Sequence, residues 1–180
     1  INSSYSHQLI SGYSAGKSSI ETYLETFSHI YNRKTVSLRL SNPYGMHQDP
    51  NSSQGVVAIF VGNALKKKKI NILNGSDLKK DYIYIEDAIK KIVNFLGEPN
   101  KTNYFVKEVV SGCKFSVLEI ASHINIHLPI LDLLPAKLIG EVDEITDKIK
   151  DDLNNPEKSD NKIFSKNLVA TIDWIQNTNF

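Results

Sequence analysis

The arrangement of apolar and polar residues along the 180-residue chain predicts alternating helices and strands. From Gly12 to Tyr31, apolar residues recur at helical spacing on one face of a predicted helix. These residues are Ile20, Tyr23, Leu24, Phe27, Ile30 and Tyr31. The segment 35–40 mixes β-branched and apolar residues and predicts a strand. The turn residues of 41–45 are expected to end that strand.

The remainder of the chain continues this alternation. Further strands are expected at 70–73, 81–85 and 103–110, and further helices at 55–67, 86–96, 116–124 and 167–176. Ser116 and Glu119 have the spacing of a capping box at a helix start. A short strand is expected within 129–135, and the charged segment 140–162 is expected to be irregular. Strands that alternate with helices predict an α/β fold with a largely parallel sheet.

Composition and charge exclude several classes of protein. The chain is 41% hydrophobic and carries a net charge of +1, so nothing directs it to nucleic acid. No apolar run approaches the ~20 residues of a membrane helix. Cys113 is the single cysteine, so no internal disulfide and no metal site is expected. A reducing cytoplasmic location fits this cysteine usage.

Tyr13 and Lys17 are the first candidates for chemistry. Residues four apart lie on one face of a helix, one turn from each other. A nearby ammonium favours the phenolate form of a tyrosine, so such a pair can move a proton to and from a hydroxyl. The Tyr-x-x-x-Lys spacing is common, however, and taken alone it favours an exposed tyrosine and lysine on an ordinary helix.

Three stretches in order change that interpretation. They are GYSAGKSSIETYLETF, VSLRLSNPYG and GVVAIFVGNALKKKKINILNGSDLKKDYIYIEDAIKKIV. Together they resemble the extended short-chain dehydrogenase/reductase family, especially its NAD-dependent nucleotide-sugar epimerases and dehydratases, the UDP-galactose 4-epimerases among them. The resemblance covers about residues 5–125 well and the tail loosely. The combination of motifs in one order is much more specific than any one motif.

The resemblance implies roles for particular residues. Tyr13 would be the general acid and base, and Lys17 would bond the nicotinamide ribose. Asn42 would contact the diphosphate, and Pro43 would lie beside the nicotinamide. The substrate-binding positions implied are Asn42, Gly55, Val56, Ile72, Asn74, Lys80 and Lys137. At the last two positions the family commonly has arginine, and lysine supplies the charge without the bidentate fork.

The resemblance also implies a cofactor, NAD or NADP, on a Rossmann-type doubly wound parallel sheet. The chain has no G-x-x-G-x-x-G loop and does not begin with Met. We therefore expect the C-terminal portion of such an enzyme, without the cofactor-binding N-terminal half, inactive alone and binding NAD weakly or not at all. Residues 1–54 and 81–112 would form the second half of the Rossmann-like domain. Residues 55–80 and 113–180 would form a small α/β substrate-binding subdomain.

Several alternatives stay open. The expected partner is a nucleotide-diphosphate sugar, but the sequence does not distinguish an epimerase from a dehydratase or a nucleotide-sugar reductase. A non-catalytic binding or regulatory relative of the same fold is the alternative from another class. The apolar stripe of helix 12–31 could form a homodimer interface or pack on the sheet. His47 and Cys113 are expected to be an exposed loop residue and a small packing residue.

Overall fold

A computed structural model describes residues 11–72, 77–97, 102–155, 159–178 and 180. The chain divides into two compact units. The strand unit comprises the described parts of Ile1–Arg39 and Ile92–Val109, and the core unit comprises the described parts of Leu40–Lys91 and Val110–Phe180.

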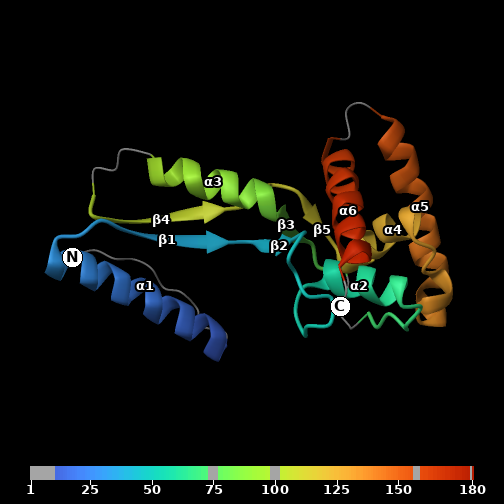
Figure 1. The fold of residues 1–180 in the computed structure, drawn as a ribbon, viewed down its shortest axis with the longest axis horizontal. Coiled ribbons are helices and arrows are strands. Elements are labelled where there is room, and N and C mark those ends of the chain that lie inside the picture. The colour runs from blue at the N-terminus through green and yellow to red at the C-terminus, as the bar shows by residue number, and fades with distance from the viewer. Residues whose placement is uncertain (1–10, 73–76, 98–101, 156–158, 179) are drawn as a thin grey trace. The chain divides into compact units, whose positions relative to one another are not determined.

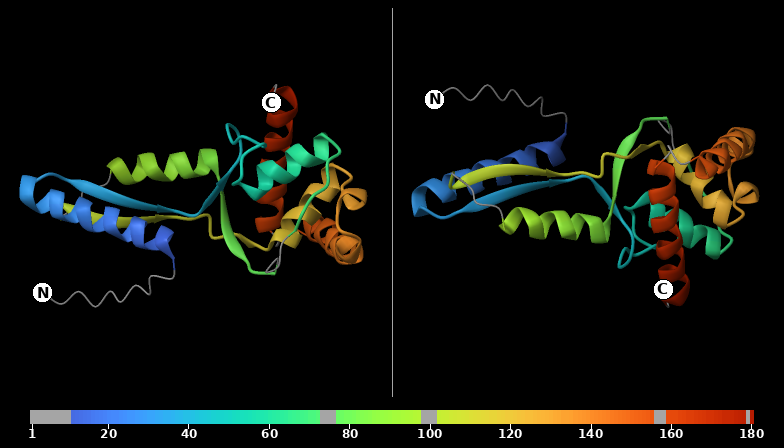
Figure 2. Two further views of the ribbon diagram at one scale, coloured as in Figure 1. Left: turned by 90° about the horizontal axis from the view of Figure 1, so that it is seen from below. Right: turned by 90° about the horizontal axis from the view of Figure 1, so that it is seen from above.

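The strand unit is built on a pair of strands, β1 (Thr35–Leu40) and β4 (Tyr104–Val109). Their arrows run in the same direction in Figure 1. Helix α1 (Gly12–Tyr31) lies on one face of the pair, and the end of α3 (Ile85–Gly97) lies on the other (Figures 1 and 2). The strand pair is therefore covered by a helix on both faces, as parallel strands usually are.

Polar contacts fix α1 to the strand pair. The Arg39 guanidinium donates two hydrogen bonds of 2.8 Å to the Glu21 carboxylate of α1. The Thr35 hydroxyl donates to the Leu24 carbonyl at 3.2 Å. On the other face, the Lys107 ammonium lies 5.1 Å from the centre of the Phe95 ring of α3. Side-chain hydrogen bonds and a cation–π contact thus connect the two helices to the strand pair.

The core unit contains a sheet of three short strands in the order β2 (Asn42–Tyr44), β3 (Lys80–Tyr84) and β5 (Lys114–Phe115). Strands β2 and β3 are parallel, with Asn42 opposite Tyr82 and Tyr44 opposite Tyr84. Strands β3 and β5 are antiparallel.

Helices supply the rest of the core unit. They are α2 (Val56–Leu65), α4 (Val117–His127), α5 (Ile139–Asn154) and α6 (Ser159–Asn177), with 3₁₀ turns at Leu131–Leu133 (η1) and Ala136–Leu138 (η2). These four α-helices form one group in both views of Figure 2. Their inward residues and those of the sheet make one apolar core that includes Val61, Ile120, Leu168 and Phe164.

The structure confirms the α/β class and most of the expected elements. The helix expected at 12–31 has those bounds, and the strand expected at 35–40 has them too. Ser116 and Glu119 do form a capping box at the start of α4. The helix expected at 167–176 begins earlier, at Ser159.

The turn predicted at 41–45 is wrong in part. Asn42–Tyr44 forms strand β2, because these residues find a parallel partner in β3.

The strand predicted at 70–73 is also wrong over its described residues. The backbone N–H of Ile70 donates to the Leu133 carbonyl at 2.8 Å, but residues 70–72 form no ladder. The strand predicted within 129–135 is a 3₁₀ turn, since the N–H groups of Leu133 and Leu134 bond to carbonyls three residues earlier.

The segment 140–162 was predicted to be irregular, and that prediction is wrong. Most of it is helix α5, whose buried Val142, Thr146 and Ile149 lie at helical spacing among many charges. Those residues face the interior of the core unit, and most charged residues of α5 are exposed. The dense charge of the segment concealed this sparse apolar pattern.

Candidate functional site

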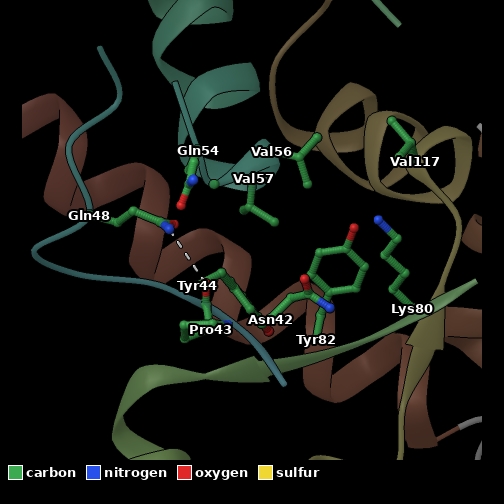
Figure 3. Close-up of a pocket in the computed structure, with 11 residues that line it drawn as sticks. Asn42, Pro43, Tyr44, Gln48, Gln54, Val56, Val57, Lys80, Tyr82 and Val117 are labelled. Atoms are coloured by element: carbon green, nitrogen blue, oxygen red, sulfur yellow. Dashed lines mark hydrogen bonds between the residues drawn. The ribbon is translucent and has the colours of Figure 1, made fainter. Parts of the chain in front are cut away.

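A cavity of about 440 Å³ opens in the core unit, between the sheet and the starts of α2 and α4 (Figure 3). Asn42 and Pro43 come from β2, Lys80 and Tyr82 come from β3, and Val117 comes from α4. The remaining lining residues are Tyr44, Gln48, Gln54, Gly55, Val56 and Val57. The volume is within the range of small-molecule sites in proteins.

The start of α2 forms one wall of the cavity. Gly55 precedes the helix with a φ of 97°, a left-handed conformation that favours glycine. A Cβ at this position would overlap the Gln48 side-chain amide, which packs against Gly55. No side chain caps the first N–H groups of α2. A helix start of this kind is suited to an anion, because its free N–H groups carry partial positive charge.

Strand β3 contributes the cavity's charge. Lys80 and Tyr82 are two residues apart and therefore lie on the same face of the strand. In Figure 3 the Lys80 ammonium and the Tyr82 hydroxyl both point into the space between α2 and α4. The adjacent Lys79 is instead paired with Glu119 at 2.6 Å. Lys80 is the only charged residue among the described residues that line the cavity.

Asp81 organises the strand from which Lys80 and Tyr82 project. Its carboxylate accepts hydrogen bonds from the N–H groups of Ser111 and Gly112 at 2.9 and 2.7 Å, and from the Ser111 hydroxyl at 3.1 Å. Its carbonyl accepts a 2.7 Å bond from the Asn42 amide. Burial opposes ionisation of Asp81, but the hydrogen bonds outweigh it and hold its pKa below the usual value.

The tyrosines of the cavity remain neutral. Burial raises the pKa of both Tyr44 and Tyr82. The Tyr44 hydroxyl also has a hydrogen bond with the Asn167 side chain of α6. These phenols can donate hydrogen bonds to a ligand or a neighbour but do not act as bases near neutral pH.

Tyr13 and Lys17 lie on α1, in the strand unit. Ser11 begins this helix with a capping box, since its hydroxyl accepts from the Ser14 N–H at 3.2 Å and the Ser14 hydroxyl accepts from the Ser11 N–H at 3.1 Å. The Lys17 ammonium lies 5.4 Å from the centre of the Tyr13 ring. Tyr13 is 75% exposed. The two side chains are therefore neighbours on an open face of α1.

The structure gathers some of the expected site residues and not others. The cavity collects Asn42, Pro43, Gly55, Val56 and Lys80. Ile72 instead packs beside the apolar core, and Lys137 is exposed on η2 and does not line the cavity. Asn74 lies outside the described residues.

Sequence reasoning missed the lining residues Tyr44, Gln48, Gln54, Val57, Tyr82 and Val117. One signal could have found Tyr82: the two-residue period of a strand places it on the same face as Lys80. The glutamines come from the loop after β2, and no periodic pattern predicts where a loop side chain points.

Within the described part of the chain, no three His, Cys, Asp or Glu side chains gather as metal ligands would. None of the described helices has the length and apolar character needed to cross a bilayer.

Comparison with known proteins identifies a family. Residues 2–106 match the model of the NAD dependent epimerase/dehydratase family. Over 78 residues, 43% of this chain, the sequence is 40% identical to dTDP-4-dehydro-6-deoxyglucose reductase of Escherichia coli, of which it covers 25%. It is 30% identical to UDP-glucose 4-epimerase of Mycolicibacterium smegmatis over 61% of this chain and 34% of that protein.

Solved structures agree with these sequence matches. A UDP-glucose 4-epimerase of Thermotoga maritima, solved with UDP-glucose, is 32% identical and superposes with a TM-score of 0.56, over 63% of this chain and 36% of that one. A UDP-N-acetylglucosamine 4-epimerase of Methanobrevibacter ruminantium, at 24% identity, shares the fold over 98% of this chain and 57% of its own, with a TM-score of 0.66. The chain spans about a quarter to a third of the curated relatives described above.

Proposed function

The chain belongs to the NAD dependent epimerase/dehydratase family, and from this premise we propose that it binds the nucleotide part of a nucleotide-diphosphate sugar in the cavity of the core unit. The observation that carries this proposal is the convergence of Lys80, Asn42 and the uncapped start of α2 on one cavity. A cation, an amide and helix N–H groups are the donors that a diphosphate requires. The UDP-glucose bound to the Thermotoga maritima relative supports this class of ligand.

The proposal includes a catalytic role for Tyr13 and Lys17. Their side chains fit such a role because both are open to a ligand and the ammonium faces the phenol ring. Tyr13 exchanges a proton with a sugar hydroxyl, and Lys17 stabilises the phenolate and bonds the nicotinamide ribose. Asn42 and Pro43 complete the contacts of this chain with the cofactor and substrate. The cofactor, NAD or NADP, supplies the hydride chemistry when bound.

Calorimetric titration of UDP and of dTDP into the chain tests the cavity. We expect binding that Lys80→Ala weakens by about 10- to 100-fold, because a charge-assisted hydrogen bond to a phosphate contributes about 1.5–3 kcal/mol. Lys79→Ala is the matched control, since the adjacent Lys79 pairs with Glu119 and does not line the cavity. Equal losses in the two variants, or no loss in either, would contradict the proposal.

The replacement Lys80→Arg sharpens the same test. The arginine fork can bond two phosphate oxygens at once, whereas lysine acts as a point charge. We expect tighter binding of UDP in this variant, by a few fold. Weaker binding would indicate that the cavity fits the lysine side chain and not the larger arginine side chain.

A second titration concerns the cofactor. Four residues of this chain are assigned to NAD(P), namely Tyr13, Lys17, Asn42 and Pro43, and the sequence holds no G-x-x-G-x-x-G loop to cradle the pyrophosphate. We therefore expect no micromolar binding of NAD and no turnover of UDP-glucose by this chain alone. Micromolar NAD binding would contradict this assignment while leaving the cavity test unaffected.

A nucleotide-sugar reductase is the second candidate function. The 40% identity to the Escherichia coli reductase favours it over the 78 matched residues. A reductase consumes one equivalent of reduced cofactor for each product, whereas an epimerase returns its hydride. Loss of nicotinamide absorbance during turnover by the whole enzyme would therefore identify a reductase.

We also propose self-association through α1. Ile20, Tyr23, Phe27 and Ile30 follow a three-four spacing, and all but the half-buried Phe27 are exposed. Sedimentation analysis is expected to show a dimer that Tyr23→Ser with Ile30→Ser disrupts. Glu25→Ser, on another face of α1, is the control and should leave the dimer intact. A monomer at micromolar concentration would contradict this part of the proposal.

A further inference from the structure

Two histidines of α4 bond to two polar residues of α6 in the core unit. His123 Nε2 lies 3.1 Å from Asn161 Oδ1, and His127 Nε2 lies 2.9 Å from Ser165 Oγ. Within each helix the two residues are four apart and share one face. The helices are therefore joined by two polar contacts, one turn apart, beside the apolar core.

The protonation state of His123 follows from its partners. The Asn161 amide nitrogen donates to Asp152 Oδ2 of α5 at 2.9 Å, which leaves its carbonyl oxygen to accept from His123. His123 Nε2 therefore carries the hydrogen, and Nδ1 is a buried acceptor with no partner among the described residues. A proton added to Nδ1 would have nothing to bond.

The surroundings of His123 also oppose a positive charge. The ring is fully buried and packs against Phe115 of β5 and Phe164 of α6, with ring centres 5.4 and 4.8 Å away. Burial lowers the pKa of His123 to about 4.

The charged or titratable groups near His123 are few. They are Glu119 and His127 of α4, and Asp152 of α5, which reaches it through Asn161. Glu119 is already bonded to Lys79 and to the Ser116 N–H. Protonation of His123 would thus place a poorly compensated charge in the apolar core, beside two phenyl rings.

Phe164, one of the two phenyl rings that contact His123, also contacts a residue that lines the cavity. Phe164 lies 5.0 Å from Tyr44, measured between ring centres, and the Tyr44 hydroxyl bonds to Asn167 on the same helix. Tyr44 lines the cavity. One wall of the cavity therefore depends on the docking of α6.

We infer that the contacts between α4 and α6 form a proton-sensitive clasp: proton uptake by His123 releases α6 from α4 and, with it, the Tyr44 wall of the cavity. His123 binds a proton readily only once it leaves the pair of phenyl rings. Acid therefore favours the state in which α6 has separated from α4. This device goes beyond the proposed function, since it requires no ligand.

Trp174 makes the clasp measurable. It is the only tryptophan of the chain, it lies on α6, and its ring is tilted against the His47 ring, with ring centres 5.3 Å apart. The experiment uses the His47→Gln background, so that no imidazole lies beside Trp174. Between pH 6.5 and 4.5 we expect the emission of Trp174 to shift to longer wavelength as α6 becomes exposed. No shift in this range would overturn the inference.

His123→Gln separates the clasp from general acid unfolding. The glutamine amide can donate to Asn161 but does not titrate, so the shift is expected to move down by at least one pH unit. His29→Gln, at an exposed position of α1, is the matched control and should change nothing. An unchanged midpoint in His123→Gln would overturn the inference.

A measurement on His123 in the unsubstituted protein does not depend on whether a variant folds. The ring C–H resonances of His123 in NMR spectra should titrate only over the pH range in which Trp174 emission changes. Titration of His123 near pH 6.5 with Trp174 unaffected would contradict the clasp.

Discussion

The two units of this chain differ in how they are held together. Every residue of the main apolar core belongs to the core unit. In the strand unit the buried residues are Ser28, Ser37 and Val109, and large apolar side chains such as Ile20, Tyr23 and Ile30 remain exposed. The core unit thus buries its own apolar surface, whereas the strand unit leaves much of its own uncovered. A site on the core unit can therefore be rigid without further contacts. The rigidity of a site on α1 depends more on whatever surface packs against that helix.

The largest expected effect comes from truncating the core. Phe164→Ala removes a ring that contacts Tyr44, Phe115 and His123. We expect the free energy of unfolding of the core unit to fall by about 3–5 kcal/mol. Denaturant titration followed by Trp174 emission measures it.

The matched change in the strand unit is Phe27→Ala, at a half-buried ring of α1. We expect it to leave the Trp174 transition within about 0.5 kcal/mol of its original position. Equal effects of the two substitutions would break the comparison between the units.

Removal of the Asp81 carboxylate is expected to have the next largest effect. Asp81→Ala leaves the N–H groups of Ser111 and Gly112 without their acceptor. We expect a loss of about 1–3 kcal/mol in the core unit. Asp143→Ala, at an exposed position of α5, is the control and should change stability by less than about 0.5 kcal/mol. A similar small effect at Asp81 would mean that its hydrogen bonds are replaced by water.

Acid should weaken the core unit through its carboxylates as well. Hydrogen bonds hold the pKa of Asp81 below its ordinary value despite burial, and the bonds of Glu119 to Lys79 and Ser116 do the same. A lowered folded-state pKa contributes stability above the unfolded pKa, near 4, and that stability is lost as the pH falls further. Urea midpoints between pH 5 and 3 should therefore decline less steeply in Asp81→Ala. An unchanged slope would show that Asp81 does not contribute to this loss of stability.

The smallest effect is expected in the strand unit. Glu21→Gln removes one charge from a pair with Arg39 whose side chains are 22% and 39% exposed. Exposed ion pairs contribute about 1 kcal/mol or less. Hydrogen exchange of α1 amides should quicken slightly, while Trp174 emission in denaturant stays unchanged. A shift of the Trp174 transition as large as that of Phe164→Ala would show that the two units unfold as one.

The sequence determined the elements whose periodic pattern was dense. Helix α1 and strand β1 were predicted at their observed bounds, and the ordered motifs indicated the family. Local chemistry carries such signals, because capping and apolar spacing act within one or two turns. Helix α5 was missed for the corresponding reason: its few apolar residues are spread among charges.

Tertiary structure alone decided the rest. Only folding brings Asn42, Gly55 and Lys80 to one cavity, because they belong to three elements far apart in the chain. It also directs the Lys80 side chain into that cavity, while the Lys79 side chain pairs with Glu119. The sequence indicates that neighbouring side chains point in opposite directions. The packing of the neighbouring helices sets which of the two lysines faces the cavity. In the sequence, nothing distinguishes His123 from an ordinary polar residue. Its burial against two phenyl rings depends on long-range packing of α4 against α6, which no local pattern encodes.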